Sequence, residues 1–501
     1  MTDGLALNLT PLLPEIVLFL AALALLVVGA FKDKEGARIV TVLAVISLIL
    51  AALLTLALSR TTVLAMGGHF VEDGFAAFFK MLIFLGAAGS LIVANGYMRD
   101  AGIERFEYPV LALFSTLGMS MMVSANSLLA LYMALELTSL PLYVMAAFNR
   151  DTVRSSEAGL KYFILGALAS GMLLYGCSLV YGFNGSLMFG ELGRALSVDG
   201  RLPVGTVVGI VFILAGLAFK LGAVPFHMWT PDVYEGSPTP VSTFFASAPK
   251  IAAMGLLIRV LMQPFGHHVV EWQQVVILIS VLSMLLGAFA AIGQTNIKRL
   301  MAYSSIGHIG YAFVGLSAGT EKGVVAVLVY MAIYVVMTVG TFACILKMRR
   351  DGRYIETIAD LAGLSASRPM MAACFAIFMF SLAGIPPLAG FFGKLYVFMA
   401  AVDAGYLWLA LFGALTSVVG AYYYLRIVKI IYFDDPAAAF DNTPHPALNA
   451  VSVIAAALIL FFIVVPGPVT RAAGSAAASL VTPASGAANV PAPASRVTAL
   501  R

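Results

Sequence analysis

The chain has 501 residues, of which 61% are hydrophobic and only 11% are charged. Soluble domains carry about 25% charged residues, so this composition excludes a water-soluble protein of this size. The formal net charge of +4 is small and gives no support for nucleic-acid binding.

Long apolar runs recur along the chain from Leu12 to Pro466. A transmembrane helix needs about 20 mostly apolar residues, and only helices or closed barrels satisfy their backbone groups in lipid. Barrel strands alternate apolar and polar residues, which these runs do not do. The sequence therefore predicts an all-α membrane protein.

About fourteen transmembrane helices are expected, joined by connections too short for a soluble domain. The expected spans are 12–31, 39–59, 75–97, 108–123, 127–148, 157–183, 205–224, 240–262, 269–293, 300–317, 323–347, 370–399, 406–432 and 447–466.

The distribution of basic residues predicts the orientation in the membrane. The first run is a span rather than a signal peptide, because its basic cluster (Lys32, Lys34, Arg38) follows it. Lysine and arginine gather in the connections that would then face the cytoplasm, so the N-terminus is expected outside. An even number of spans places the C-terminus outside as well. The Ala/Pro/Ser-rich segment 467–501 is expected to be a disordered tail.

Two groups of five spans, 108–265 and 266–433, have a common feature. In each group the fourth span is broken by proline, at Pro225 in the first and at Pro386-Pro387 in the second. Five is odd, so the second group would be inverted relative to the first, as in many transporters. Three helices in 1–107 precede these repeats, and one last helix in 434–466 follows them.

Several ionisable residues lie inside the expected spans, and five of them are candidate functional groups, namely Glu136, Lys220, Lys250, His308 and Lys394. A charge within a membrane span is costly and is usually functional. A single buried Glu–Lys pair can be structural, but no structural need explains all five of these groups, which are here called the row.

The chemistry that these residues suit is proton movement. Burial lowers the pKa of a lysine and raises that of a glutamate, and a nearby opposite charge reverses both effects. A pair that opens and closes can therefore take up and release a proton, and histidine titrates near neutral pH unaided. The prolines open their helices and create hydrated positions at mid-depth.

Other charged residues near the ends of the spans have simpler structural explanations. Lys80 and Lys161 lie near the ends of their spans and are expected to extend to the membrane interface. Glu157 and Lys161 are four residues apart, which is typical of a surface ion pair, although the pair could also feed protons inward.

Three stretches carry a family resemblance: 219–229 (FKLGAVPFHMW), 230–241 (TPDVYEGSPTPV) and 297–311 (IKRLMAYSSIGHIGY). With these motifs the chain resembles the antiporter-like subunits of respiratory complex I, a family that shares its core with multi-subunit cation/proton antiporters. The resemblance extends over nearly the whole chain as far as Pro466. It favours the branch with about fourteen spans and no long C-terminal lateral helix.

The resemblance implies a role for each buried charge. Glu136 and Lys220 resemble the modulating carboxylate–lysine pair of the first half-channel. Lys250 resembles the central connector, His308 the next relay and Lys394 the terminal lysine of the second half-channel.

The resemblance also implies a proton-translocating subunit in the membrane arm of NADH:quinone oxidoreductase, in the bacterial inner membrane with both termini periplasmic. This chain would hold no cofactor, since NADH, FMN, iron–sulfur clusters and quinone would be bound by other subunits. Subunits K and M would be its neighbours. The alternatives are a subunit of a stand-alone cation/proton antiporter and a scaffold whose charges are vestigial.

Overall fold

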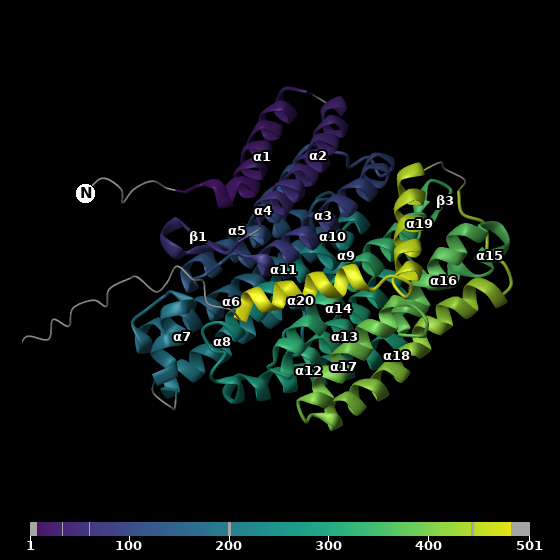
Figure 1. Cartoon of the computed structure of the whole chain (residues 1–501). Coiled ribbons are helices and arrows are strands. Elements are labelled where there is room, and N and C mark those ends of the chain that lie inside the picture. Colours follow the sequence, from purple (N-terminus) through teal and green to yellow (C-terminus); the bar gives the residue numbers. More distant parts are fainter. Residues whose placement is uncertain (1–7, 33, 60, 199–201, 442–444, 482–501) are drawn as a thin grey trace, which may run out of the picture.

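The computed structural model describes residues 8–32, 34–59, 61–198, 202–441 and 445–481, and it is a bundle of helices (Figure 1). Strands within this part form two short antiparallel hairpins. The hairpins pair β1 (Val63–Ala65) with β2 (Phe70–Glu72) and β3 (Arg349–Arg350) with β4 (Arg353–Tyr354). The predicted all-α membrane class is confirmed.

Three long helices form the N-terminal unit. They are α1 (Leu13–Phe31), α2 (Lys34–Leu58) and α3 (Gly74–Asp100), with short 3-10 turns at Thr10–Leu12 and Met66–Gly68. The pair α1 and α2 lies at one edge of the bundle, where side chains such as Leu20 and Leu53 are exposed (Figure 1). Such an apolar outer surface suits lipid or a neighbouring subunit rather than water.

The next group of helices contains the first break. Its members are α4 (Glu107–Val123), α5 (Leu128–Ala146), α6 (Val153–Asn184), α7 (Phe189–Val198), α8 (Val204–Leu221), α9 (Trp229–Gly236), α10 (Thr239–Ala246) and α11 (Ala248–Met262). Helix α8 ends at Gly222, whose φ of +70° is accessible at little cost only to glycine. The chain resumes as α9 after the turn that contains Pro225, so α8 and α9 are two halves of one broken helix.

The following group contains the second break. Its members are α12 (Val269–Ile292), α13 (Ile297–Ser317), α14 (Glu321–Ile345), a 3-10 turn (Ile358–Leu361), α15 (Leu364–Ser367), α16 (Pro369–Ala383), α17 (Ala389–Asp403) and α18 (Leu407–Phe433). Helix α16 ends at Gly384 with a φ of +84°, and α17 resumes beyond Pro386-Pro387.

Corresponding helix pairs pack together in the two groups. Helix α4 packs on α5 as α12 packs on α13, and α6 packs on α8 as α14 packs on α16. Helix α11 closes the first group against α4, as α18 closes the second against α12. This agreement supports the repeat, while the exact domain boundaries stay predictions.

Ten helical segments of the described chain are long and apolar enough to cross a membrane. The other four expected spans correspond to α4, α13, α16 with α17, and α19 (Pro446–Phe461). These are short, broken or less apolar. The count of fourteen therefore stays a prediction.

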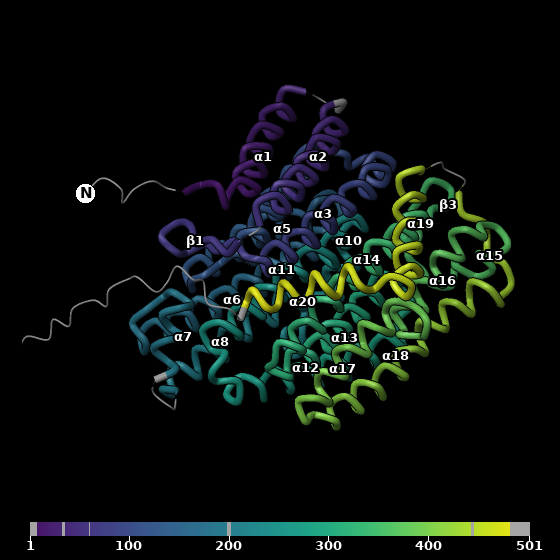
Figure 2. The backbone as a smooth tube through the Cα atoms, viewed as in Figure 1, coloured from purple at the N-terminus to yellow at the C-terminus, as the bar shows by residue number. Residues whose placement is uncertain are grey.

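A further helix, α20 (Gly467–Val481), follows α19 and crosses the face of the bundle (Figure 2). The prediction of a disordered tail is wrong over 467–481, and residues 482–501 lie outside the described part. Alanine is the best helix former, and Ala473, Ala476 and Ala477 are buried where α20 packs on α3 and α14. Small side chains allow the helices to approach closely. The alanine-rich segment 467–481 is therefore helical because it packs against neighbouring helices.

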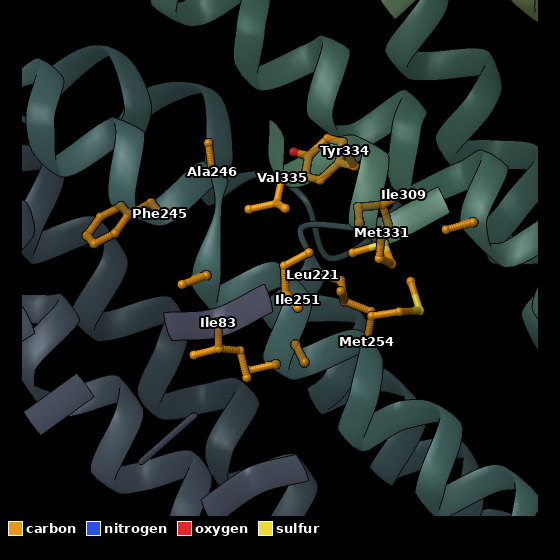
Figure 3. Packing of buried hydrophobic residues seen from close by; sticks show 14 of the residues in the cluster. Ile83, Leu221, Phe245, Ala246, Ile251, Met254, Ile309, Met331, Tyr334 and Val335 are labelled. Carbon is orange, nitrogen blue, oxygen red and sulfur yellow. The ribbon is translucent and has the colours of Figure 1, made fainter. Parts of the chain in front are cut away.

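The interior around Leu221, at the end of α8 next to the first break, is apolar (Figure 3). Leu221 and Ile251, which directly follow Lys220 and Lys250 in the sequence, pack with Ile83 of α3 and Met254 in this core. Any ionisable side chain here therefore depends on a few specific polar partners.

Candidate functional site

Lys220 lies in the last turn of α8, next to the first break. Its ammonium donates a hydrogen bond to the Ser139 hydroxyl on α5 and lies 5.3 Å from the centre of the Tyr143 ring. A cavity of about 10 Å³ adjoins it, lined also by Tyr162 and Trp229. This volume is about that needed for one water molecule.

Glu136 lies on α5, one turn before Ser139. Its carboxylate is within electrostatic range of the Lys220 ammonium, but no ion pair joins them in the described structure. Its Oε1 atom is buried and has no hydrogen-bond partner in the part of the chain that the structure describes. An unpaired buried acceptor is costly. The pair is therefore open in this structure, and Glu136 has a free site for a proton or for the lysine.

Lys250 lies on α11 and is 1% exposed. Its ammonium donates to the Ser305 hydroxyl on α13 and lies 5.6 Å from the centre of the Tyr234 ring. A Cβ atom added at Gly222 would lie 3.6 Å from the Lys250 Nζ. The first break, which the sequence associates with Lys220, therefore also lies against Lys250.

His308 lies on α13, and both of its ring nitrogens have a phenol partner. Its Nδ1 is 2.6 Å from the Tyr330 hydroxyl and its Nε2 is 3.2 Å from the Tyr424 hydroxyl, which in turn contacts Ser304 at 2.5 Å. The ring is within electrostatic range of both Lys250 and Lys394. His308 is thus the group that links the two halves of the row.

Lys394 lies near the start of α17, against the end of α16. Its ammonium donates to the carbonyl oxygens of Leu382 (3.1 Å) and Ala383 (2.8 Å) and to the Ser417 hydroxyl (2.8 Å). The first two are carbonyls at the C-terminus of α16, where the helix dipole favours a cation. A cavity of about 10 Å³ is lined by both Lys394 and His308. It can hold one water between them.

Each buried lysine of the row donates to a serine on a neighbouring helix. These serines are Ser139, Ser305 and Ser417. A hydroxyl both donates and accepts, so it can pass a proton onward. Sequence reasoning missed this feature, although Ser139 lies three residues after Glu136 and Ser305 three residues before His308.

The predicted Glu157–Lys161 pair is present at the surface, with 2.8 Å between Oε1 and Nζ. Lys161 also pairs with Asp232 of α9 at 2.8 Å. These three residues line an open pocket of about 140 Å³. Tyr162, the next residue along α6, lines the Lys220 cavity. The surface pocket therefore lies beside the inner cavity.

The Lys80 side chain does not reach the surface of the protein, so the expectation that it extends to the membrane interface is wrong. Its side chain is fully buried, and its ammonium bridges Glu15 (2.7 Å) and Glu72 (2.5 Å). These partners come from α1 and from the hairpin before α3. Lys80 is buried because the fold brings these two carboxylates to it, and the sequence around Lys80 does not show this.

Two more ion pairs, one fully and one partly buried, were not identified from the sequence. The Arg259 guanidinium on α11 donates to both carboxylate oxygens of Asp73, at 2.9 and 2.8 Å. Lys298 at the start of α13 pairs with Glu356 at 2.7 Å.

Glu356 predicts a pH effect on stability. Burial raises the pKa of this carboxyl, but Lys298 and Arg154 act in the opposite direction and leave it below its usual value. A lowered native pKa means that the stabilisation is present above the ordinary value of about 4.3 and is lost as the pH falls through the native value. Glu356→Gln is expected to cost about 1–3 kcal/mol at pH 7, measured as a lower thermal midpoint.

The matched control for this prediction is Glu191→Gln, at an exposed position on α7. The difference between Glu356→Gln and the unaltered protein should shrink as the pH is lowered toward 4. An unchanged midpoint at pH 7 would contradict the assigned role of Glu356.

One protein-family model matches the central part of the chain. Residues 125–420 match the family model described as NADH:quinone oxidoreductase/Mrp antiporter, transmembrane. This segment contains every residue of the row.

Curated relatives resemble the chain over almost its whole length. NADH-quinone oxidoreductase subunit N of Parvibaculum lavamentivorans is 57% identical over 471 residues, which cover 94% of this chain and 97% of the relative. The subunit N of Rhodospirillum rubrum is 56% identical, with 95% and 98% covered.

Solved structures share the fold. A chain of respiratory complex I from Thermus thermophilus with bound aureothin has a TM-score of 0.79 and 34% identity, covering 92% of this chain and 100% of that chain. A chain of the Mrp complex from a Dietzia species has a TM-score of 0.84 at 22% identity, with 95% and 98% covered, which is a likeness of fold alone. The chain therefore belongs to the antiporter-like membrane subunits of NADH-quinone oxidoreductase, in the family of subunit N.

Proposed function

We propose that this chain moves protons across the membrane as one membrane-arm subunit of a NADH:quinone oxidoreductase. The observation that carries the proposal is the row of buried groups, in which His308 is within electrostatic range of Lys250 and Lys394, and Gly222 of the first helix break lies against Lys250. Each lysine has a serine partner that can relay a proton. Electron transfer takes place in other subunits.

The open Glu136–Lys220 pair supplies the control step. An approaching carboxylate favours the protonated form of a lysine, and its withdrawal favours proton release. Lys220 is held by Ser139 on the same helix as Glu136, so a movement of α5 changes both contacts together. A conformational change that closes this pair would then shift a proton along the row.

The surface pocket lined by Glu157, Lys161 and Asp232 is the proposed entry. Lys161→Ala is expected to reduce proton pumping less than about fivefold, because exposed ion pairs contribute only about 0–1 kcal/mol. Proton uptake by membrane vesicles measures this effect. A loss as large as that from changing a buried lysine would show that Lys161 is part of the row itself.

The remaining assignments rest on the family. The chain would lie between subunits K and M in the inner membrane, with both termini periplasmic and NADH, FMN, iron–sulfur clusters and quinone bound elsewhere in the complex. The basic hairpin with Arg349, Arg350 and Arg353 supports a cytoplasmic position for its connection.

A stand-alone cation/proton antiporter is the second candidate, because the Mrp chain shares the fold at a TM-score of 0.84. The identity of 34% to the complex I chain, against 22% to the Mrp chain, favours the first candidate. Affinity purification of the tagged chain from native membranes distinguishes them. We expect flavin, iron and NADH:quinone activity to co-purify, whereas other antiporter subunits without iron would contradict the proposal.

A further inference from the structure

A second cluster of buried charges lies in the N-terminal helices, away from the row. Lys80 on α3 is fully buried, and its Nζ lies 2.7 Å from the Glu15 Oε1 on α1 and 2.5 Å from the Glu72 Oε2 at the end of β2. The Phe70 ring covers the ammonium, with its centre 4.8 Å away. The Ser120 hydroxyl on α4 donates to Glu15.

The charges of this cluster do not balance. Two carboxylates face one ammonium, and both carboxylates are at least 96% buried. The second oxygen of each, Glu15 Oε2 and Glu72 Oε1, is buried without a hydrogen-bond partner among the described residues. Asp73, the residue after Glu72, is itself paired with Arg259 through two hydrogen bonds. One negative charge of the cluster is therefore uncompensated if both glutamates are ionised.

The simplest way to compensate the extra negative charge of the cluster is to bind a proton on one of the two glutamates. Glu15 receives two hydrogen bonds, from Lys80 and from Ser120, whereas Glu72 receives one from Lys80 alone. The carboxylate with fewer donors is the easier one to protonate. Burial raises the pKa of Glu72. The nearby Lys80 ammonium lowers this pKa only in part, and the Glu15 carboxylate raises it further. Buried glutamates with pKa values of about 8 to 9 occur in proteins.

Apolar packing separates the cluster from the row. Lys250 and Arg259 lie on the same helix, but Phe79 and Val123 pack against Gly255 between them. The cluster therefore does not extend the row, and it lies where α1 is attached to α3 and α4.

We propose that Glu15, Glu72 and Lys80 form a separate proton-binding site, which holds one proton on the Glu72 carboxyl at neutral pH. The bound proton leaves one matched ion pair, Lys80 with Glu15, and so makes the attachment of α1 to the bundle dependent on protonation.

Infrared spectroscopy of the purified complex that contains this chain tests the site without reference to turnover. The carbonyl stretch of a protonated carboxyl would be compared at pH 7 in the unaltered complex, Glu72→Gln and Glu15→Gln. Each substitution leaves a neutral Lys80–glutamate pair, so both variants should assemble. The control is Glu191→Gln, at an exposed position on α7 away from the cluster.

We expect the signal of one protonated carboxyl to disappear in both variants and to stay in the control. Glu72→Gln removes the protonated group itself, and Glu15→Gln lets Glu72 ionise against Lys80. Retention of the signal in both variants would show that both glutamates are ionised and would overturn the site. Loss in Glu72→Gln alone, or failure of both variants to assemble, would contradict the shared proton.

Discussion

Replacing Lys250 by alanine is expected to lower NADH:quinone turnover and proton uptake together, by about a hundredfold or more. Lys250 is the central protonatable group, and the first break and Ser305 lie beside it. Without it, a proton must cross this buried position as an unpaired charge, at a cost of several kcal/mol. Each 1.36 kcal/mol is about tenfold in rate. Both rates would be measured in the same membrane vesicles.

Two variants separate charge from proton transfer at this position. Lys250→Arg keeps the positive charge but cannot release a proton, so it should be nearly as impaired as the alanine variant. Lys322→Ala removes a lysine whose side chain is 80% exposed and should leave both rates unchanged. Normal activity in Lys250→Arg would mean that only the charge matters.

Loss of Arg259 is expected to prevent stable assembly. The Arg259 guanidinium also donates to the Val123 carbonyl, and with Asp73 it forms a bidentate pair of which less than 2% is exposed. Removing one partner of a buried pair costs about 3–5 kcal/mol, because the other charge stays buried and unpaired. Arg259→Leu should therefore lower the yield of assembled complex and its thermal midpoint.

The compensating variant tests this explanation. Asp73 also caps α3 by accepting a hydrogen bond from the Ala76 amide at 2.7 Å, a contact that asparagine can keep. Adding Asp73→Asn to Arg259→Leu removes the unpaired charge and should recover much of the lost stability. If the double variant is less stable than the single one, the unpaired carboxylate is not the cause.

Much of the candidate site could be predicted from the sequence, because its signals are local. A lysine or glutamate inside an apolar run is visible at once, and so are Pro225 and Pro386-Pro387 within spans. The structure has breaks at both positions and places His308 within electrostatic range of Lys250 and of Lys394. Their roles as proton carriers stay predictions.

The partners of these groups could not be predicted, because they depend on packing between distant helices. Ser139 and Lys220 are 81 residues apart, and Lys80 meets Glu15 through the placement of α1. Helix α20 was missed for the same reason. Its alanine-rich sequence is compatible with either a helix or a disordered tail. The segment is helical because it is buried against α3 and α14.

The most direct test of the central claim is Lys220→Ala in the assembled complex, with NADH:quinone turnover and proton uptake measured in the same vesicles. Lys220 is the partner of the open Glu136 carboxylate, so its loss should abolish both activities while assembly stays intact. Normal turnover together with normal proton uptake would contradict the account and leave Lys220 a structural residue.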